Sequence, residues 1–259
     1  MVLYTWGRGE DGQLGLGDAS DQLKPVNVEI LKDKPVVQIA CGSGHTVVLT
    51  EDGVVWTWGR GDDGRLGHGD NGWKYVPRPV VALDGKIVRQ VTCGSYHTAA
   101  VTADGQLWTW GGGMYGKLGH GNESGHAKPC LVKALRGQPV TQVACGSRHT
   151  VALLDTQEVY TWGDKENGVS GHGDTDGYQY LPRVVDALIG QRTTQISACG
   201  FHTCAVTTSG ELFTFGEGKF GRLGHGNEAN AVVPRRVETL VGSFIVQVAC
   251  GGFHTACVS

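Results

Sequence analysis

Apolar and polar residues alternate along short stretches of this chain, and the same alternation returns five times. A well-defined copy has apolar segments at 36–42 and 45–50, then a Glu-Asp-Gly turn, then the segment 54–59. In that last segment Trp56 and Trp58 alternate with Thr, so aromatic and hydroxyl side chains lie on opposite faces of a strand. A Gly-rich loop and a short Pro-x-x-Val segment follow. Each copy therefore predicts four strands, and no stretch has the periodicity of a helix.

Three sequence markers fix the length of the repeat. Thr-Trp-Gly recurs at intervals of 52 residues, and Cys-Gly-x-x-His-Thr recurs at intervals of 52 or 53. A Pro stands 20 residues before each of these His, so the single inserted residue lies between His172 and Pro182. We interpret the recurring aromatic and His as structural repeat positions: Trp6, Trp58, Trp110, Trp162, Phe215, His45, His97, His149, His202 and His254.

Four short strands in each of five units predict an all-β fold, because no such unit buries its apolar face alone. We expect β-propeller blades, each a four-stranded antiparallel sheet with the Pro segment as its edge strand. The prediction is one repeat domain over residues 1–259. Its units are about 1–53, 54–105, 106–157, 158–210 and 211–259.

Composition narrows the class of protein. Gly makes up 42 of the 259 residues without a Gly-X-Y period, which indicates many tight turns. The net charge of −3 is spread evenly and neither end is basic, which argues against nucleic acid or a membrane surface as partner. The eight Cys contain no C-x-x-C and follow the repeat, as expected of buried thiols in a reducing compartment. We predict a cytoplasmic or nuclear protein.

The repeated motifs resemble a known family. The segments YTWGRGEDGQLGLGD, TWGRGDDGRLGHGD, TWGGGMYGKLGHGN and FTFGEGKFGRLGHGN are each followed by V-x-x-V-A-C-G-x-x-H-T or a close variant. They are similar to the regulator of chromosome condensation repeat, in the style of the repeat domains of HECT-type ubiquitin ligases. The resemblance implies a β-propeller, usually of seven blades. It also implies one possible activity, guanine-nucleotide exchange on a Ran-like small GTPase.

Five repeats leave two architectures open. Residues 1–28 contain the third and fourth strands of a blade, and 246–259 contain the first and second. The two ends together complete one blade of a closed five-bladed ring, which we favour. The alternative is an open, five-bladed part of a seven-bladed propeller.

Several motifs that suggest cofactors have a simpler interpretation. The range Gly7–Gly12 matches the dinucleotide fingerprint G-x-G-x-x-G, and three later loops match it too. That fingerprint holds a pyrophosphate only where it leads into a helix, and here it leads into Leu-Gly-x-Gly. Asp174–Gly177 lacks the later ligands of a calcium loop. Light-sensing members of the family carry Trp in G-W-R-H-T, whereas Gly, Tyr, Arg or Phe precedes His-Thr here. We expect no cofactor.

The histidines and cysteines also follow the repeat. Nine of the ten His occupy repeat positions, one per blade in each class, which keeps equivalent imidazoles apart. We predict that each bonds to backbone at a strand end, that His126 lies in a surface loop, and that no metal is bound. Ala198 occupies the slot of Cys41 and Cys250, which indicates that this Cys serves packing. The second class of repeated His, in Leu-Gly-His-Gly, is His68, His120, His172 and His225.

Functional signal is expected where the repeats differ. The loops after Trp-Gly vary in charge and aromatic content, and loops on one face of a propeller are where repeat proteins usually bind. A second variable set, Trp73, Lys74, Tyr75, Tyr178 and Tyr180, fits a binding surface and packing under its own loops equally well. The candidate partner-binding residues are Arg8, Glu10, Asp11, Arg60, Asp62, Asp63, Met114, Tyr115, Lys165, Glu166, Lys219 and Phe220.

Two functions fit these features. The first is a protein-interaction scaffold, free-standing or within a larger signalling or ubiquitin-ligase protein. The second is guanine-nucleotide exchange on a small GTPase, which needs no covalent chemistry. No nucleophile, P-loop or zinc-hydrolase motif is present in the sequence, so we predict no catalytic residues and no enzyme.

Overall fold

The computed structural model describes residues 2–259, and its strands form four-stranded antiparallel sheets in series. The prediction of an all-β fold is confirmed. Contacts divide the chain into two compact units. The first runs up to Gly113 and includes Ser124–Val132. The second comprises Met114–Glu123 and Lys133–Ser259.

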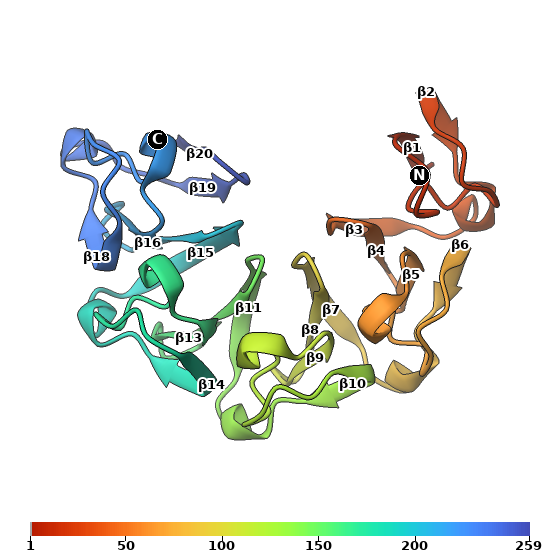
Figure 1. Cartoon of the computed structure of the whole chain (residues 1–259), viewed down its shortest axis with the longest axis horizontal. Helices are drawn as coiled ribbons and strands as arrows, with labels where there is room; N and C mark the ends of the chain where they lie inside the picture. The colour runs from red at the N-terminus through yellow and green to blue at the C-terminus, as the bar shows by residue number, and fades with distance from the viewer. Residues whose placement is uncertain (1) are drawn as a thin grey trace. The chain divides into compact units, whose positions relative to one another are not determined.

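The first unit contains two complete sheets and one strand pair (Figure 1). Neighbouring strands follow chain order, so each sheet is a meander with its Pro-containing strand at one edge. The pair is β1 (Tyr4–Gly7) and β2 (Gln22–Asn27). The first sheet is β3 (Val36–Cys41), β4 (His45–Thr50), β5 (Val55–Gly59) and β6 (Lys74–Pro79). The second is β7 (Val88–Cys93), β8 (His97–Thr102), β9 (Leu107–Gly111) and β10 (His126–Leu131).

The second unit repeats this arrangement with the strand pair at its other end (Figure 1). Its first sheet is β11 (Val140–Cys145), β12 (His149–Leu154), β13 (Val159–Asp164) and β14 (Tyr178–Val184). Its second is β15 (Thr193–Cys199), β16 (His202–Thr207), β17 (Leu212–Gly216) and β18 (Ala231–Arg236). The pair is β19 (Gln247–Cys250) and β20 (Thr255–Val258).

Short 3-10 helices of three residues join the strands. One set lies between the third and fourth strands of a sheet: η2 (Asp62–Gly64), η4 (Met114–Gly116), η6 (Glu166–Gly168) and η8 (Lys219–Gly221). The other set follows the fourth strand: η1 (Glu29–Leu31), η3 (Val81–Leu83), η5 (Lys133–Leu135), η7 (Asp186–Leu188) and η9 (Glu238–Leu240). Single turns of this kind reverse the chain without building a helical layer.

The core lies between successive sheets within each unit. The first strand of one sheet packs beside the first strand of the next, as β3 does with β7 and β15 does with β19. The second strands β4, β12 and β16 are buried along their whole length. Removing a side chain such as Val47 from water contributes about 1.5–3 kcal/mol, and the core that buries it includes Val91 and Ala100 of the neighbouring sheet. The repeat unit is therefore stable only within an array.

A glycine in each repeat also makes space for the aromatic side chain of the next repeat. Gly67 has a φ of +82°, and a Cβ there would lie 2.8 Å from Nε1 of Trp110. Gly171 holds Phe215 in the same way, at 2.8 Å from its ring. Both aromatic side chains are fully buried, whereas Trp6 in β1 is 60% exposed. The glycine of Leu-Gly-His-Gly therefore makes room for an aromatic ring.

The histidine before Thr is held by the next sheet. His45 Nε2 lies 3.0 Å from Thr98 Oγ1, and Thr98 donates its hydroxyl hydrogen to the carbonyl of Arg65 at 2.8 Å. Because that hydrogen is already used, His45 must donate its Nε2–H to Thr98. Burial lowers the pKa of His45 to about 3. His149 and Thr203 repeat this bond at 2.9 Å.

Two predictions about histidine were wrong. The Nε2 partner of His45, His149 and His202 is a threonine hydroxyl and not a backbone group. His68 has both kinds of partner, because it bonds to the backbone of Thr57 and its Nε2 lies 2.9 Å from Thr57 Oγ1. A hydroxyl is favoured because it accepts from the imidazole while donating to a carbonyl, so two buried groups are satisfied at once. His126 is the first residue of β10, where it pairs with Gly111, and not a loop residue.

Candidate protein-interaction surface

The loop between the third and fourth strands has one unusual backbone position. The middle residue of its 3-10 turn adopts left-handed φ, +61° at Asp63, +60° at Asn167, +67° at Tyr115 and +62° at Phe220. Asp and Asn tolerate this conformation, but an aromatic residue there costs on the order of 1–2 kcal/mol. Backbone strain of this kind concentrates at functional sites. The two aromatic copies are therefore the loops of greatest interest.

The loop and the turn before His-Thr form one surface in each blade. The N–H of Arg60 donates to the carbonyl of Gly44 at 2.7 Å, and the N–H of Glu217 donates to the carbonyl of Phe201 at 2.8 Å. In a four-stranded meander, the first-to-second and third-to-fourth connections lie at the same end of the sheet. Side chains from both connections therefore meet there.

In the first unit this surface is charged. Arg60 stacks over Trp73, with 5.6 Å from its guanidinium carbon to the ring centroid, and its Nε donates to Asp62 at 2.5 Å. Trp73 also donates its indole N–H to Asp62 at 3.1 Å. These two bonds lower the pKa of the Asp62 carboxyl, the bond from Arg60 most. On the preceding loop Arg8 pairs with Glu10 at 2.6 Å.

A buried arginine supports the same surface from below. Arg65 is 2% exposed and donates to the carbonyls of Asp62 and Ser95 at 2.9 and 3.1 Å. Its guanidinium lies 5.0 Å from the ring centroid of Tyr96 and forms an ion pair with Asp63 at 3.1 Å. Burial lowers the pKa of Arg65. Tyr96 is 48% exposed, so its outer face stays available above this support.

In the second unit the surface is aromatic around Arg148. Its guanidinium lies 4.7 Å from the centroid of Tyr115 and 5.4 Å from that of Phe201. Tyr115 also meets Tyr178 edge to face, with centroids 5.2 Å apart. Arg148 forms an ion pair with Glu166 at 3.0 Å, so the cation is held by both aromatic and acidic groups. Such stacks contribute about 0.5–2 kcal/mol each and fix the rings.

A second aromatic cluster in this unit is more exposed. Phe220 and Phe253 meet edge to face with centroids 5.9 Å apart, and they are 61% and 66% exposed. Buried Arg222 lies 5.8 and 5.2 Å from the two centroids and pairs with Glu217 at 2.8 Å. Met114 on η4 is 62% exposed. We call Phe220 and Phe253 with Arg222 the phenylalanine pair and its arginine.

The structure places the predicted candidate residues at three depths. Asp11 is buried, Asp62, Tyr115 and Lys165 are half-buried, and the others are exposed. In the second variable set, Trp73 supports Arg60, and Tyr178 and Tyr180 meet edge to face at 6.2 Å. Sequence reasoning missed the residues that organise the surface, although their repeated slots before Leu-Gly and before His-Thr were a usable signal. These are Arg65, Tyr96, Arg148, Phe201, Arg222 and Phe253.

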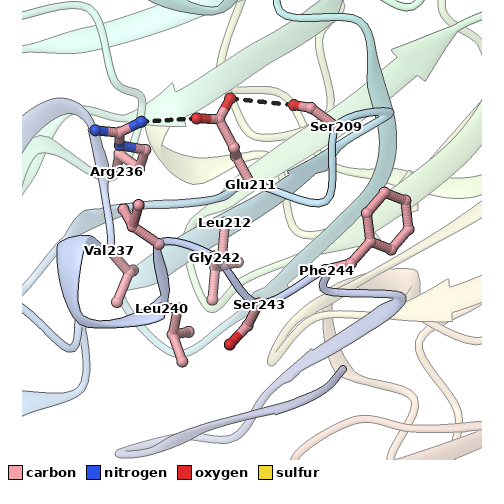
Figure 2. Close-up of a pocket in the computed structure, with 10 residues that line it drawn as sticks. Ser209, Glu211, Leu212, Arg236, Val237, Leu240, Gly242, Ser243 and Phe244 are labelled. Atoms are coloured by element: carbon pink, nitrogen blue, oxygen red, sulfur yellow. Dashed lines mark hydrogen bonds and ion pairs between the residues drawn. The ribbon is translucent and has the colours of Figure 1, made fainter.

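One pocket lies at the opposite end of a blade. It has a volume of about 170 Å³ and is bounded by the β16–β17 turn, β18 and the segment after η9. Figure 2 shows Arg236 and Ser209 both pointing at Glu211, with distances of 2.8 and 3.1 Å. Its charged groups are thus already paired with one another. The pocket is a gap between sheets and carries no catalytic constellation.

The arrangement of the sheets and loops defines a class of protein. Meandering four-stranded sheets that pack first strand to first strand, with sequence variation in the loops, are typical of a repeat protein of the β-propeller type. The family model described as RCC1-like domain matches residues 2–259, and the chain belongs to that family. The resemblance seen in the sequence is thereby confirmed.

Two curated proteins are similar to this chain in sequence. The chain is 39% identical over 257 residues to the ultraviolet-B receptor UVR8 of Arabidopsis thaliana, covering 98% of this chain and 58% of that protein. It is 42% identical over 262 residues to the E3 ubiquitin-protein ligase HERC2 of Homo sapiens, covering 99% of this chain and 5% of that protein. The chain thus spans little more than half of the plant receptor and one short region of the ligase.

Solved structures agree on the fold. Human WBSCR16 superposes with a TM-score of 0.86 at 29% identity, over 98% of this chain and 66% of that one. Yeast RCC1 (Prp20), solved with Kap60, gives a TM-score of 0.83 at 23% identity, over 98% of this chain and 61% of that one. Within residues 2–259 no helix has the length and apolar character needed to cross a membrane.

Proposed function

We propose that this chain is a protein-interaction domain that binds a partner protein at the loop surface and performs no covalent chemistry. The observation that carries the proposal is the phenylalanine pair and its arginine. Phe220 and Phe253 are mostly exposed, yet a left-handed backbone and a buried guanidinium hold Phe220 in place. Aromatic residues that are rigid and exposed dominate protein-binding energetics, because little side-chain entropy is lost on binding.

Packing under their own loops does not account for these rings. At exposures of 61% and 66% they bury too little surface to offset the strain at Phe220. Tyr96 occupies the slot of Phe253 in a blade whose third strand is present, and it too is 48% exposed. Phe201 in the same slot is half-buried, so exposure differs between blades. The exposed rings of Tyr96 and Phe253 are the ones that support a binding role.

The relatives and the composition support the cellular setting of the proposal. HERC2, by its name a ubiquitin-protein ligase, contains a region 42% identical to this chain, which fits a module that recruits a protein within a larger signalling or ligase chain. The eight free cysteines, four of which share one repeat slot, support the cytoplasm or nucleus. An even surface charge of −3 in total supports a protein partner over nucleic acid.

Site-specific photo-crosslinking tests the proposal. A photoreactive phenylalanine at position 220 is expected to capture a discrete protein from cell extract, and Phe253→Ser is expected to weaken that capture at least about tenfold, as loss of a hot-spot residue does. The matched control places the same group at Val241, which is 60% exposed at the other end of the blade. Equal capture at both positions, or none at Phe220, would reject the loop surface.

Nucleotide exchange is the rival function, and one assay separates it. If the chain acts only as a scaffold, fluorescent GDP leaves a Ran-like GTPase at the same rate with and without it. Acceleration by several orders of magnitude would overturn the scaffold proposal and establish exchange.

We further propose that the strand pairs at the two ends are halves of one blade, in the closed five-bladed ring or against further repeats. A cavity of about 250 Å³ lies beside Gly224 and Val237. Gly224 is the repeat equivalent of Gly67, and the space beside Gly67 is filled by Trp110. In a ring that closes on itself, Trp6 fills it. Acrylamide then quenches the fluorescence of the wild type and of Trp6→Phe to the same extent, whereas an exposed Trp6 makes the wild type more sensitive.

A further inference from the structure

The contact between the second strand of one sheet and the first strand of the next uses the same two slots each time. In the first unit Val47 of β4 belongs to the core against which Cys93 of β7 packs. In the second unit Val151 of β12 belongs to the core against which Ala198 of β15 packs. At these two interfaces the two slots therefore bring together at most one thiol.

The interface between β16 and β19 differs, because both slots hold cysteine. Cys204 occupies the slot of Val47 and Val151, and Cys250 occupies the slot of Cys93 and Ala198. Their sulfur atoms lie 3.3 Å apart. Cys204 is fully buried. Two thiols are therefore in contact at this interface, where the other two interfaces have at least one apolar side chain.

A histidine completes the group. The ring nitrogen of His202 and the sulfurs of Cys204 and Cys250 all lie within 4.8 Å of one another. His202 is fully buried, and its Nε2 lies 2.9 Å from Thr255 Oγ1, which donates its own hydrogen to the carbonyl of Arg222 at 2.7 Å. Thr255 can therefore only accept, so Nε2 carries the hydrogen and Nδ1 has a lone pair.

That lone pair is buried and has no hydrogen-bond partner. His45 and His149 have the same unpartnered Nδ1, but at His202 two soft sulfur ligands lie beside it. The bond from Nε2–H to Thr255 is the outer-shell bond that fixes the tautomer of a metal-binding imidazole. The same bond exists at His149, but there the two slots hold Val151 and Ala198.

We propose that His202, Cys204 and Cys250 bind a zinc ion that joins the sheet β15–β18 to the pair β19–β20. Two thiolates and an imidazole are ligands of Zn²⁺, and two thiolates neutralise its charge, as a buried site requires. Tetrahedral geometry with Zn–S bonds of about 2.3 Å places the sulfurs about 3.8 Å apart, which small side-chain rotations supply. Cys257 follows Thr255 by two residues in β20, faces the same side, and can supply a fourth ligand.

The surrounding hydrogen bonds hold the two ligand strands in register. The side chain of Gln195 accepts from the N–H of Val248 at 2.8 Å and donates to its carbonyl at 3.4 Å. Ser197 Oγ accepts from the N–H of Cys250 at 2.9 Å. Both bonds connect β15 to β19, so the thiols are brought together before any ion arrives, which lowers the cost of binding.

Titration of the reduced protein with Co²⁺, a spectroscopic substitute for Zn²⁺, tests the proposal. We expect one equivalent to bind with thiolate-to-cobalt charge-transfer absorption, to be displaced by Zn²⁺, and to raise the melting temperature. Cys204→Val and Cys250→Ala install the residues that the repeat itself uses in these slots, so both variants are expected to fold. Each is expected to weaken binding more than about 100-fold, beyond the 10–100-fold of an outer-shell change.

A gain-of-site variant makes the test stricter. Val47→Cys places a second thiol beside Cys93 and His45, and it is expected to raise the number of bound Co²⁺ ions from one to two. Absence of thiolate absorption in the wild type, or binding that survives Cys204→Val, would overturn the proposal. A thiol titration gives a further outcome that would overturn the proposal. If the purified wild type has two fewer reactive thiols than its eight cysteines predict, and Cys204→Val does not show this loss, the two cysteines form a disulfide and not a zinc site.

Discussion

Acidification from pH 7.5 to 5.5 is expected to destabilise this protein through its buried histidines. Burial lowers the pKa of His45 and of His149 from 6.5 to about 3. Between these values the unfolded chain binds a proton that the folded chain does not. The stability that each neutral histidine provides is therefore complete above pH 6.5 and is lost progressively as the pH falls toward 3.

The expected magnitude follows from the unfolded-state pKa. At pH 5.5, one unit below 6.5, protonation of the unfolded state removes roughly 1 kcal/mol for each such histidine, and 2–3 kcal/mol for the two together. His68, His172 and His225 have lowered pKa values as well and add in the same direction. Carboxylates titrate mainly below pH 5, so this window isolates histidine.

Urea unfolding followed by tryptophan fluorescence measures the effect. The urea midpoint is expected to fall steadily from pH 7.5 to 5.5 in the wild type. His149→Gln removes one titrating group, so its midpoint is expected to start lower and to depend less steeply on pH. A midpoint that is flat over this range would refute the reasoning, and so would an unchanged pH slope in His149→Gln.

Two further predictions concern backbone and interface. Gly59→Ala is expected to cost at least about 2 kcal/mol in urea unfolding, because φ is +103° and the new Cβ would lie 2.5 Å from the carbonyl oxygen of Gly44. Gly85→Ala, at +77° with nothing within 4 Å, is expected to cost only about 1 kcal/mol, and equal losses would contradict the role of the close approach. Gln195→Leu is expected to cost about 1–3 kcal/mol and to speed amide exchange at Val248, whose N–H loses its acceptor.

The fold was predictable from the sequence because the same pattern of apolar and polar residues occurs five times. The predicted strand 54–59 is β5 at Val55–Gly59, and 45–50 is β4 at the same residues. Alternation at period two fixes which face of a strand is buried, and the constant distance from Pro to His fixes the register between copies. Errors of one residue in a single copy are therefore corrected by the others.

The organisation of the surface was not predictable in the same way. Arg65 follows β5 of one sheet and stacks on Tyr96 of the next sheet, and neither position is unusual when the sequence of one blade is inspected alone. The left-handed backbone at Phe220 results from the turn geometry and contradicts the local preference of an aromatic residue. Cys204 meets Cys250 only because the second strand of one sheet faces the first strand of the next. These features depend on contacts between repeats, which a pattern within one repeat does not specify.

The bond from His45 to Thr98 has a consequence for synthesis on the ribosome. The imidazole lies in one sheet and its hydroxyl partner lies in the next, 53 positions later in the chain. A newly made blade therefore emerges with this imidazole exposed to water, as His254 is in the last strand pair, and the imidazole becomes a buried core group only after the following blade has left the exit tunnel. Each blade thus commits to its final structure one repeat late, and the array matures in order from its N-terminal end.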